Sequence, residues 1–153
     1  MNERLSPWRL GATLYMPATR TDIADAVLHN KIDGLRSLVI CLEDAVSDAD
    51  IPLARRNLRQ VLTRLAAAKK LQGNANWPLV FVRPRDITMG AELAADWDLS
   101  GVDGLVLPKC TRHCLPVWWA MLKDSHLCMM PTLETEEVFD VVQMRELSAS
   151  LAN

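Results

Sequence analysis

The fold is decided by the stretch Leu38-Val39-Ile40-Cys41-Leu42-Glu43-Asp44-Ala45-Val46, where five apolar residues run directly into two acids. A continuous apolar run of this length is typical of a strand buried on both faces, as in a parallel sheet covered by helices. In α/β folds, ligand-binding and catalytic residues collect at the carboxyl ends of the strands. Glu43 and Asp44 therefore lie where a functional site is expected, although an acid pair here can also serve only as a cap for the loop or the next helix.

The same pattern, an apolar run that ends in polar residues, recurs along the chain. Five strands alternate strictly with helical segments, and this alternation predicts a parallel sheet with right-handed crossovers. A series of strand ends that mixes acids with bases describes a site able to bind a cation and a carboxylate together. The expected strands are 12–16, 38–42, 79–82, 104–107 and 127–130, and the polar residues that follow them are Thr19 and Arg20, Glu43 and Asp44, Arg83 and Arg85, Lys109, and Glu134.

Apolar residues at helical spacing predict a helix after each strand. The first is capped by Thr21 or Asp22, and the second begins near Pro52 and ends at Lys69 or Lys70. A loop is expected over 72–76 and a short helix over 91–97. The fourth helix is expected to pack Leu115, Trp118, Trp119 and Leu122 on the sheet, and the last to bury Val138, Val141, Val142 and Leu147.

Length and composition predict one globular domain over residues 1–153. The chain is long enough for a sizeable core, and half of its residues are hydrophobic and 24% charged. A net charge of −2 gives no basic field that would recruit nucleic acid or an anionic membrane. No apolar run approaches the ~20 residues of a membrane span, and Met1–Arg4 do not begin a signal peptide. We therefore expect a cytoplasmic protein.

The four cysteines agree with a reducing compartment. Cys41 and Cys128 lie inside apolar runs and are predicted to be small core residues. Cys110 and Cys114 flank His113, which suggests a zinc site. No second ligand pair lies at zinc-site spacing, so zinc is a minor alternative.

Several short blocks, in this order, resemble the HpcH/HpaI aldolase and citrate lyase family, and within it the citrate lyase beta-subunit-like proteins. The resemblance implies a TIM-type (β/α)8 barrel that uses a divalent metal, usually Mg²⁺, to cleave or form carbon–carbon bonds. The implied substrates are small oxo- or hydroxy-acids, often as coenzyme A thioesters. The blocks are Leu14-Tyr15-Met16-Pro17, Leu42-Glu43-Asp44-Ala45-Val46, Val82-Arg83, Asp103-Gly104-Leu105-Val106-Leu107-Pro108-Lys109 and Leu133-Glu134-Thr135.

The resemblance also implies roles for single residues. Glu134 matches a direct metal ligand, Glu43 an acid that supports the metal shell, and Arg83 the group that grips the substrate carboxylate or oxo group. Mg²⁺ prefers oxygen ligands and polarises a carbonyl as a Lewis acid, while an arginine offers two parallel donors to a carboxylate. Glu43 and Arg83 are thus the expected catalytic residues, and Arg83, Thr19, Arg85 and Lys109 the expected substrate-binding residues.

The chain departs from the family pattern in two ways. The family's Pro-Gly-Asn turn is Pro17-Ala18-Thr19 here, and Arg85 replaces an Asn, so citryl-CoA is not inferred as substrate. A complete barrel has eight units in ~250 residues, and five are present. The family's second metal-binding Asp follows a sixth strand that this chain does not have. We therefore expect a partial barrel with an open, apolar inner face. Such a chain pairs with a second copy or another chain that completes the barrel, is part of a longer product, or is only marginally folded.

Two other interpretations remain open. The chain could be a non-catalytic remnant or subunit of such an enzyme, or a five-stranded doubly wound signalling or nucleotide-binding domain. Against the latter, no Gly-rich phosphate loop follows the first strand. Strand order separates the folds, because a barrel arc has the order 1-2-3-4-5 and a doubly wound sheet 2-1-3-4-5. In the barrel, Glu43, Arg83, Lys109 and Glu134 must meet at one end of the sheet.

Overall fold

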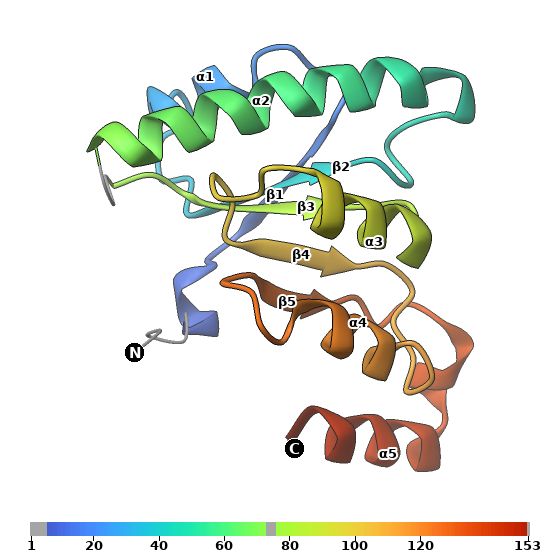
Figure 1. Cartoon of the computed structure of the whole chain (residues 1–153). Coiled ribbons are helices and arrows are strands. Elements are labelled where there is room, and N and C mark those ends of the chain that lie inside the picture. The colour runs from blue at the N-terminus through green and yellow to red at the C-terminus, as the bar shows by residue number, and fades with distance from the viewer. Residues whose placement is uncertain (1–5, 73–75, 153) are drawn as a thin grey trace.

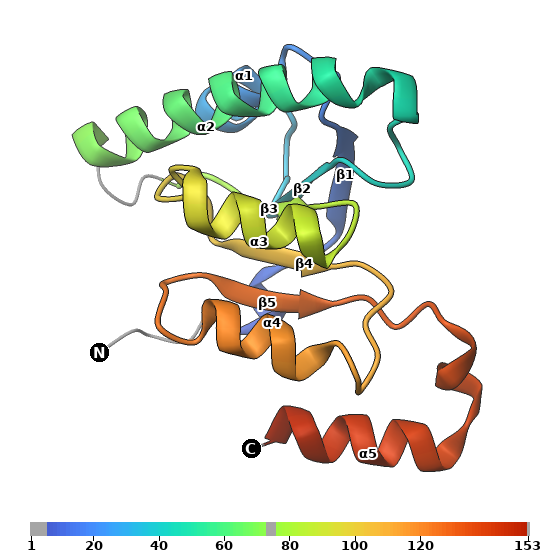
Figure 2. The ribbon, with the colours of Figure 1, turned by 45° about the vertical axis from the view of Figure 1, so that its right-hand side comes forward.

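A single curved sheet of five parallel strands forms the centre of the computed structural model, which describes residues 6–72 and 76–152. The strand order is β1-β2-β3-β4-β5, and Figure 2 shows β4 and β5 side by side with arrowheads that point the same way. This order confirms the partial TIM-type barrel and excludes the doubly wound alternative. The strands are β1 (Thr13–Pro17), β2 (Ser37–Cys41), β3 (Leu79–Arg83), β4 (Gly104–Leu107) and β5 (Cys128–Pro131).

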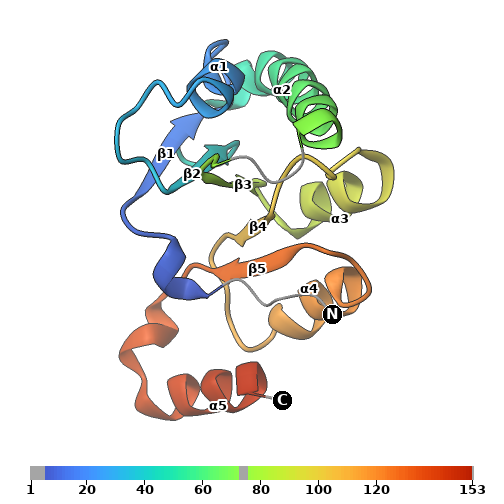
Figure 3. The ribbon, with the colours of Figure 1, turned by 90° about the vertical axis from the view of Figure 1, so that its left-hand side faces the viewer.

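Helices follow the strands in the predicted alternation, and α1 to α4 lie along the outer face of the sheet (Figures 1 and 3). Side chains that point outward from the strands, such as Ile40, Val82 and Leu105, pack with α2 to α4 in the larger hydrophobic core. Among the described helices, none is long and apolar enough to cross a membrane. The helices are α1 (Ile23–Leu28), α2 (Ile51–Gln72), α3 (Ile87–Asp96), α4 (Leu115–Leu122) and α5 (Val141–Ala152), with 3-10 turns η1 (Pro7–Arg9), η2 (Asp48–Asp50) and η3 (Glu136–Phe139).

The inner face of the sheet is less open than the sequence suggested. Val39, Phe81 and Val106 point to this side and form a second, smaller cluster in which each is at most 3% exposed. Leu10, from the segment before β1, packs against the same cluster and helps to cover it. The expectation of an exposed inner face therefore fails for the central strands. It holds at an edge strand, where Tyr15 on β1 is 41% exposed.

One helix start and one helix end differ from the sequence prediction. The helix expected over 91–97 begins at Ile87, because the Asp86 side chain accepts a hydrogen bond from the Met89 N–H at 2.8 Å and caps an earlier turn. The helix after β2 begins at Ile51, as expected, and continues to Gln72. Residues 73–75 of the expected loop lie outside the described residues.

Two predictions about buried side chains are partly wrong. In α4, Trp118 is buried, but its neighbour Trp119 is 53% exposed. In α5, Leu147 is buried, whereas Val141 and Val142 are both more than 60% exposed. Val138 belongs to η3 instead of the last helix, and Asp140 caps α5 by accepting from the N–H of Val142. The first turn of α5 therefore projects away from the core instead of packing on it.

Candidate functional site

Arg83, the last residue of β3, is the centre of a charged cluster at the carboxyl end of the sheet. Its side chain is 7% exposed, and its Nη2 atom forms ion pairs with three carboxylates. These are Glu43, Asp44 at 3.3 Å and Glu134 at 2.6 Å. Because β2, β3 and β5 are parallel, the residues that follow them converge on one edge. The predicted meeting of Glu43, Arg83 and Glu134 is therefore confirmed.

Lys109, two residues after β4, ties the cluster together from the other side. Its Nζ atom lies 2.8 Å from Glu43 Oε1, and its backbone N–H donates to Glu134 Oε1 at 3.0 Å. Lys109 has a φ of +47°, in the left-handed region that few non-glycine residues adopt. Backbone strain of this kind is concentrated at functional sites. Here the strained turn brings both the backbone N–H and the ammonium group of Lys109 to the two acids.

The cluster also contains a buried polar atom that lacks a hydrogen bond. Glu43 is 6% exposed, and its two carboxylate oxygens lie against the Arg83 guanidinium and, at 2.8 Å, the Lys109 ammonium group. Among the described residues, the Nε atom of Arg83 is buried without a hydrogen-bond partner. A buried polar group left in this state costs about 1–3 kcal/mol. Unsatisfied groups in a native structure point to a missing ion, water or ligand.

The charges of the cluster favour the ionised forms of Arg83 and Glu134. Burial alone would lower the pKa of Arg83, but the charges of Glu43 and Glu134 outweigh it, so that the pKa is raised. Burial alone would raise the pKa of Glu134, but hydrogen bonds from the Lys109 N–H and the Thr132 hydroxyl, with the positive charge of Arg83, hold the pKa below its ordinary value. At Glu134, these donors and charges therefore outweigh the cost of burial.

This pKa shift predicts a pH dependence of stability. Because the pKa of folded Glu134 lies below its ordinary value of 4.5, the charged carboxylate stabilises the fold above that pH, and the contribution is lost as the pH falls through the folded-state value. Glu134→Gln should therefore flatten the decline of unfolding free energy between about pH 5 and about pH 3, by less than about 1 kcal/mol because Glu134 is partly exposed. Urea unfolding across this range, with the exposed Glu136→Gln as control, measures the difference; equal slopes in both variants would contradict it.

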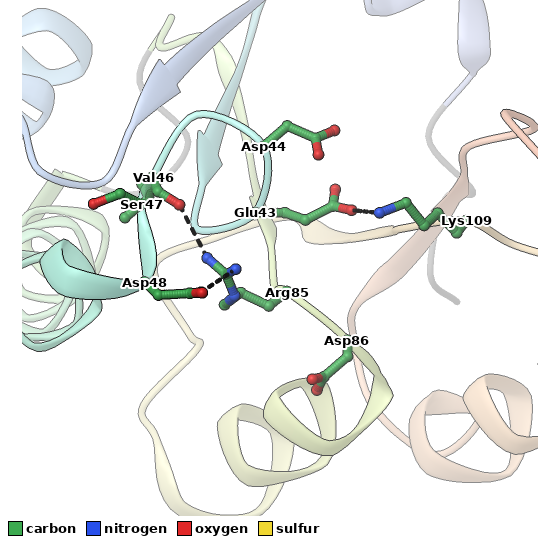
Figure 4. A pocket seen from close by; sticks show the side chains of 8 residues that line it. All are labelled: Glu43, Asp44, Val46, Ser47, Asp48, Arg85, Asp86 and Lys109. Carbon is green, nitrogen blue, oxygen red and sulfur yellow. Dashed lines mark hydrogen bonds and ion pairs between the residues drawn. The ribbon is translucent and has the colours of Figure 1, made fainter.

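A pocket of about 490 Å³ opens beside the cluster. Figure 4 shows Glu43 and Lys109 in contact on one side of it and Arg85 on the other. Arg85 donates to the Val46 carbonyl at 2.9 Å and to Asp48 at 2.5 Å, so it holds the turn after β2 in addition to lining the pocket. The lining combines acids with two cations: Glu43, Asp44, Asp48, Asp86, Arg85 and Lys109.

The predicted site residues thus divide into three groups. Glu43, Arg85 and Lys109 line the pocket, while Arg83 and Glu134 join it through their contacts with Glu43 and Lys109. Thr19 is not among the lining residues, and its carbonyl accepts a hydrogen bond from Asn57 on α2 at 2.8 Å. Its role in substrate binding stays a prediction.

Tyr15 is a neighbour of the site that the sequence reasoning missed. The Cζ atom of Arg83 lies 6.0 Å from the centre of the Tyr15 ring, and a hydrogen bond that Arg83 donates to the Tyr15 side chain contributes to the raised pKa of Arg83. Tyr15 pairs with Val39 of β2, which in turn pairs with Phe81, two residues before Arg83. The period of two along a strand puts Tyr15 and Arg83 on the same inner face. That periodicity was a signal that could have identified it.

The donor set suits a hard cation in part. Within residues 6–72 and 76–152, no group of three or more His, Cys, Asp or Glu side chains is arranged to hold a metal. Mg²⁺, however, is commonly held by one or two carboxylates and keeps its remaining positions for water and substrate. Glu43 and Glu134 supply two such carboxylates, and both lie against the same nitrogen of Arg83. The residues present therefore fit Mg²⁺ as a pair of oxygen donors.

Comparison with known proteins gives one match and one negative result. A family model described as C-C bond lyase of the TIM-barrel fold matches residues 4–153. A search of curated proteins found no match. The matched range includes all five strands and every residue of the charged cluster.

Proposed function

Because this chain belongs to the C-C bond lyase family of the TIM-barrel fold, we propose that it is a Mg²⁺-dependent lyase or aldolase of the citrate lyase beta-subunit-like kind. The proposed substrate is a small oxo- or hydroxy-acid, as the free acid or as its coenzyme A thioester. We further propose that it acts in the cytoplasm. The pocket of about 490 Å³ is of a suitable size, since small-molecule sites range over about 300–1,000 Å³.

The observation that carries this proposal is the buried charged cluster around Arg83. The carboxylates of Glu43 and Glu134 lie against one nitrogen of Arg83, at the edge of the sheet where the chemistry of α/β barrels takes place. Among the described residues, the Arg83 Nε atom has no hydrogen-bond partner. Carboxylate oxygens fit a cation, and the unpaired guanidinium donor fits an oxygen of a carboxylate or oxo group. The cluster is therefore complementary to a metal ion and an acid substrate.

The residues of the cluster would divide the work of binding. Glu134 and Glu43 would hold the ion, which when bound would supply a Lewis acid to the substrate carbonyl. Arg83 would grip the substrate carboxylate or oxo group with a donor that is now unpaired. Lys109, whose side chain is 63% exposed, is free to turn from Glu43 toward an anionic group in the pocket. Arg85 shapes the pocket by fixing the turn after β2.

Magnesium binding provides the test. If Glu43 and Glu134 hold Mg²⁺, the ion should stabilise the folded chain by about 1.4 kcal/mol at ten times its dissociation constant. As MgCl₂ is increased, the melting temperature of the unmodified chain should therefore rise, and that of Glu134→Gln should stay unchanged. The exposed acid Asp22, which pairs with Arg20, supplies the control: Asp22→Asn should respond like the unmodified chain. An equal response in all three proteins would contradict the proposal.

A non-catalytic subunit is the second candidate, and one contact favours it. Arg83 bridges both acids that would hold the ion, so the guanidinium already supplies the positive charge that they need. In that case, Mg²⁺ should leave the melting temperature unchanged while the chain stays folded. A lyase assay on a panel of small hydroxy- and oxo-acids, free and as thioesters, would then give no product.

A further inference from the structure

Two cysteines lie side by side in the loop between β4 and α4. Their Sγ atoms are 3.9 Å apart, and both are free thiols. Cys110 is 1% exposed, and its N–H donates to the Thr132 carbonyl at 3.0 Å, which fixes it beside β5. Cys114 is half-buried and directly precedes α4. The pair adjoins the candidate site, because Cys110 follows Lys109, but the proposed lyase chemistry does not use it.

The two thiols differ in a way that gives each a separate part in disulfide exchange. Burial, together with the neighbouring Cys114, raises the pKa of Cys110 to about 12, so this thiol is protonated and a poor nucleophile at neutral pH. Cys114 is the more exposed residue of the two. Its sulfur also accepts a hydrogen bond from the Thr111 N–H at 3.2 Å, a contact that holds it near Cys110.

We propose that Cys110 and Cys114 form a redox-active dithiol that a small-molecule disulfide oxidises to an intramolecular disulfide. The Cys114 thiolate attacks one sulfur of the oxidant, which breaks the oxidant's S–S bond, releases one thiolate and leaves a mixed disulfide on Cys114. Deprotonated Cys110 then attacks the Cys114 sulfur and releases the second thiolate. The protein loses two electrons and two protons, and the oxidant takes up both as two thiols.

The geometry allows both steps with small movements. A disulfide bond is about 2.05 Å long, so the sulfurs must approach by roughly 2 Å, which a half-buried side chain at the end of a loop can provide. Cys114 heads α4 without a side-chain capping bond, so its sulfur can move without loss of a cap. Once Cys114 is in the mixed disulfide, its contribution to the raised pKa of Cys110 is removed, which helps the second step.

The sequence supplies a direct readout. The full chain is incubated in mixtures of reduced and oxidised glutathione, its remaining thiols are blocked, and it is digested with trypsin. Arg112 lies between the two cysteines, so cleavage there separates the peptide 110–112 from the peptide 113–123. We expect oxidised glutathione to link these two peptides, with a combined mass lower by two hydrogen atoms, and reduction to separate them. Absence of the linked pair under excess oxidised glutathione would overturn the proposal.

Single substitutions test the order of attack. In Cys110→Ala the resolving thiol is missing, so one glutathione should remain on Cys114 as a stable mixed disulfide. In Cys114→Ala the remaining thiol is buried, and Cys110 should take up glutathione much more slowly. Cys128→Ala is the matched control and should form the 110–114 link like the unmodified chain. Equal glutathione uptake by Cys110→Ala and Cys114→Ala would contradict the assigned roles. The linked peptides of the unmodified chain test the formation of the disulfide without any variant, so this test holds even if a variant folds poorly.

Discussion

Replacement of Arg83 by leucine is expected to lower the free energy of unfolding by about 3–5 kcal/mol, the range for loss of one partner of a buried ion pair. Arg83 and Glu43 are both less than 10% exposed, so leucine would leave the buried Glu43 carboxylate with the largely exposed Lys109, at 2.8 Å, as its remaining cationic partner. The second acid, Glu134, would also lose its 2.6 Å contact. Urea unfolding of the purified variant measures the loss.

A double-mutant cycle separates the ion pair from simple packing. Removal of both charges in Arg83→Leu with Glu43→Leu should recover most of the lost stability, because no uncompensated charge then remains buried. The exposed pair Arg20–Asp22 is the matched control, and Arg20→Leu should cost far less stability than Arg83→Leu. If Arg83→Leu lowered the free energy of unfolding as little as Arg20→Leu, the prediction would be wrong. The cluster would then be hydrated, and its charges would be only weakly coupled.

The second large effect concerns assembly, and we expect the isolated chain to associate in solution. Strands β1 and β5 form the two edges of the described sheet, and an edge strand is where another chain can add by backbone pairing. Exposed apolar side chains lie beyond the β5 edge, with Phe139 90% and Val142 61% exposed. Burial of several hundred Å² of apolar surface in an interface would stabilise the assembly by on the order of 10 kcal/mol. Light scattering should therefore give at least twice the mass of one chain, with a melting temperature that rises with protein concentration.

Charges placed on the exposed apolar side chains test where the association occurs. Phe139→Asp with Val142→Asp should shift the particle mass toward one chain, while a charge at the remote and equally exposed Leu71 should not. Substitutions at such exposed positions change folding stability by about 0.5 kcal/mol or less. A stable monomer with substantial lyase turnover would contradict the expectation that a second copy or another chain completes the barrel.

The sequence alone determined the architecture and the edge of the sheet on which the site lies. The apolar runs of the three central strands are typical of strands covered on both faces, and those strands are buried throughout. The alternation of strands with helical periods predicts parallel pairing. Parallel pairing then brings the residues after β2, β3, β4 and β5 to one edge. Glu43, Arg83, Lys109 and Glu134 were predicted to meet for this reason, and they do.

The tertiary structure decided which of these groups touch and which other residues join them. One nitrogen of Arg83 contacts Glu43, Asp44 and Glu134. Asp44 and Glu134 lie 39 and 51 positions from Arg83 in the sequence, and contacts over such separations depend on the curvature of the sheet and on side-chain rotamers. Tertiary packing also determines three other features. These are the left-handed turn at Lys109, the packing of Leu10 on the inner face of the sheet, and the 3.9 Å distance between the sulfurs of Cys110 and Cys114. Periodicity in a sequence records which face of an element is buried, but the partners across that face are fixed only when the elements pack together.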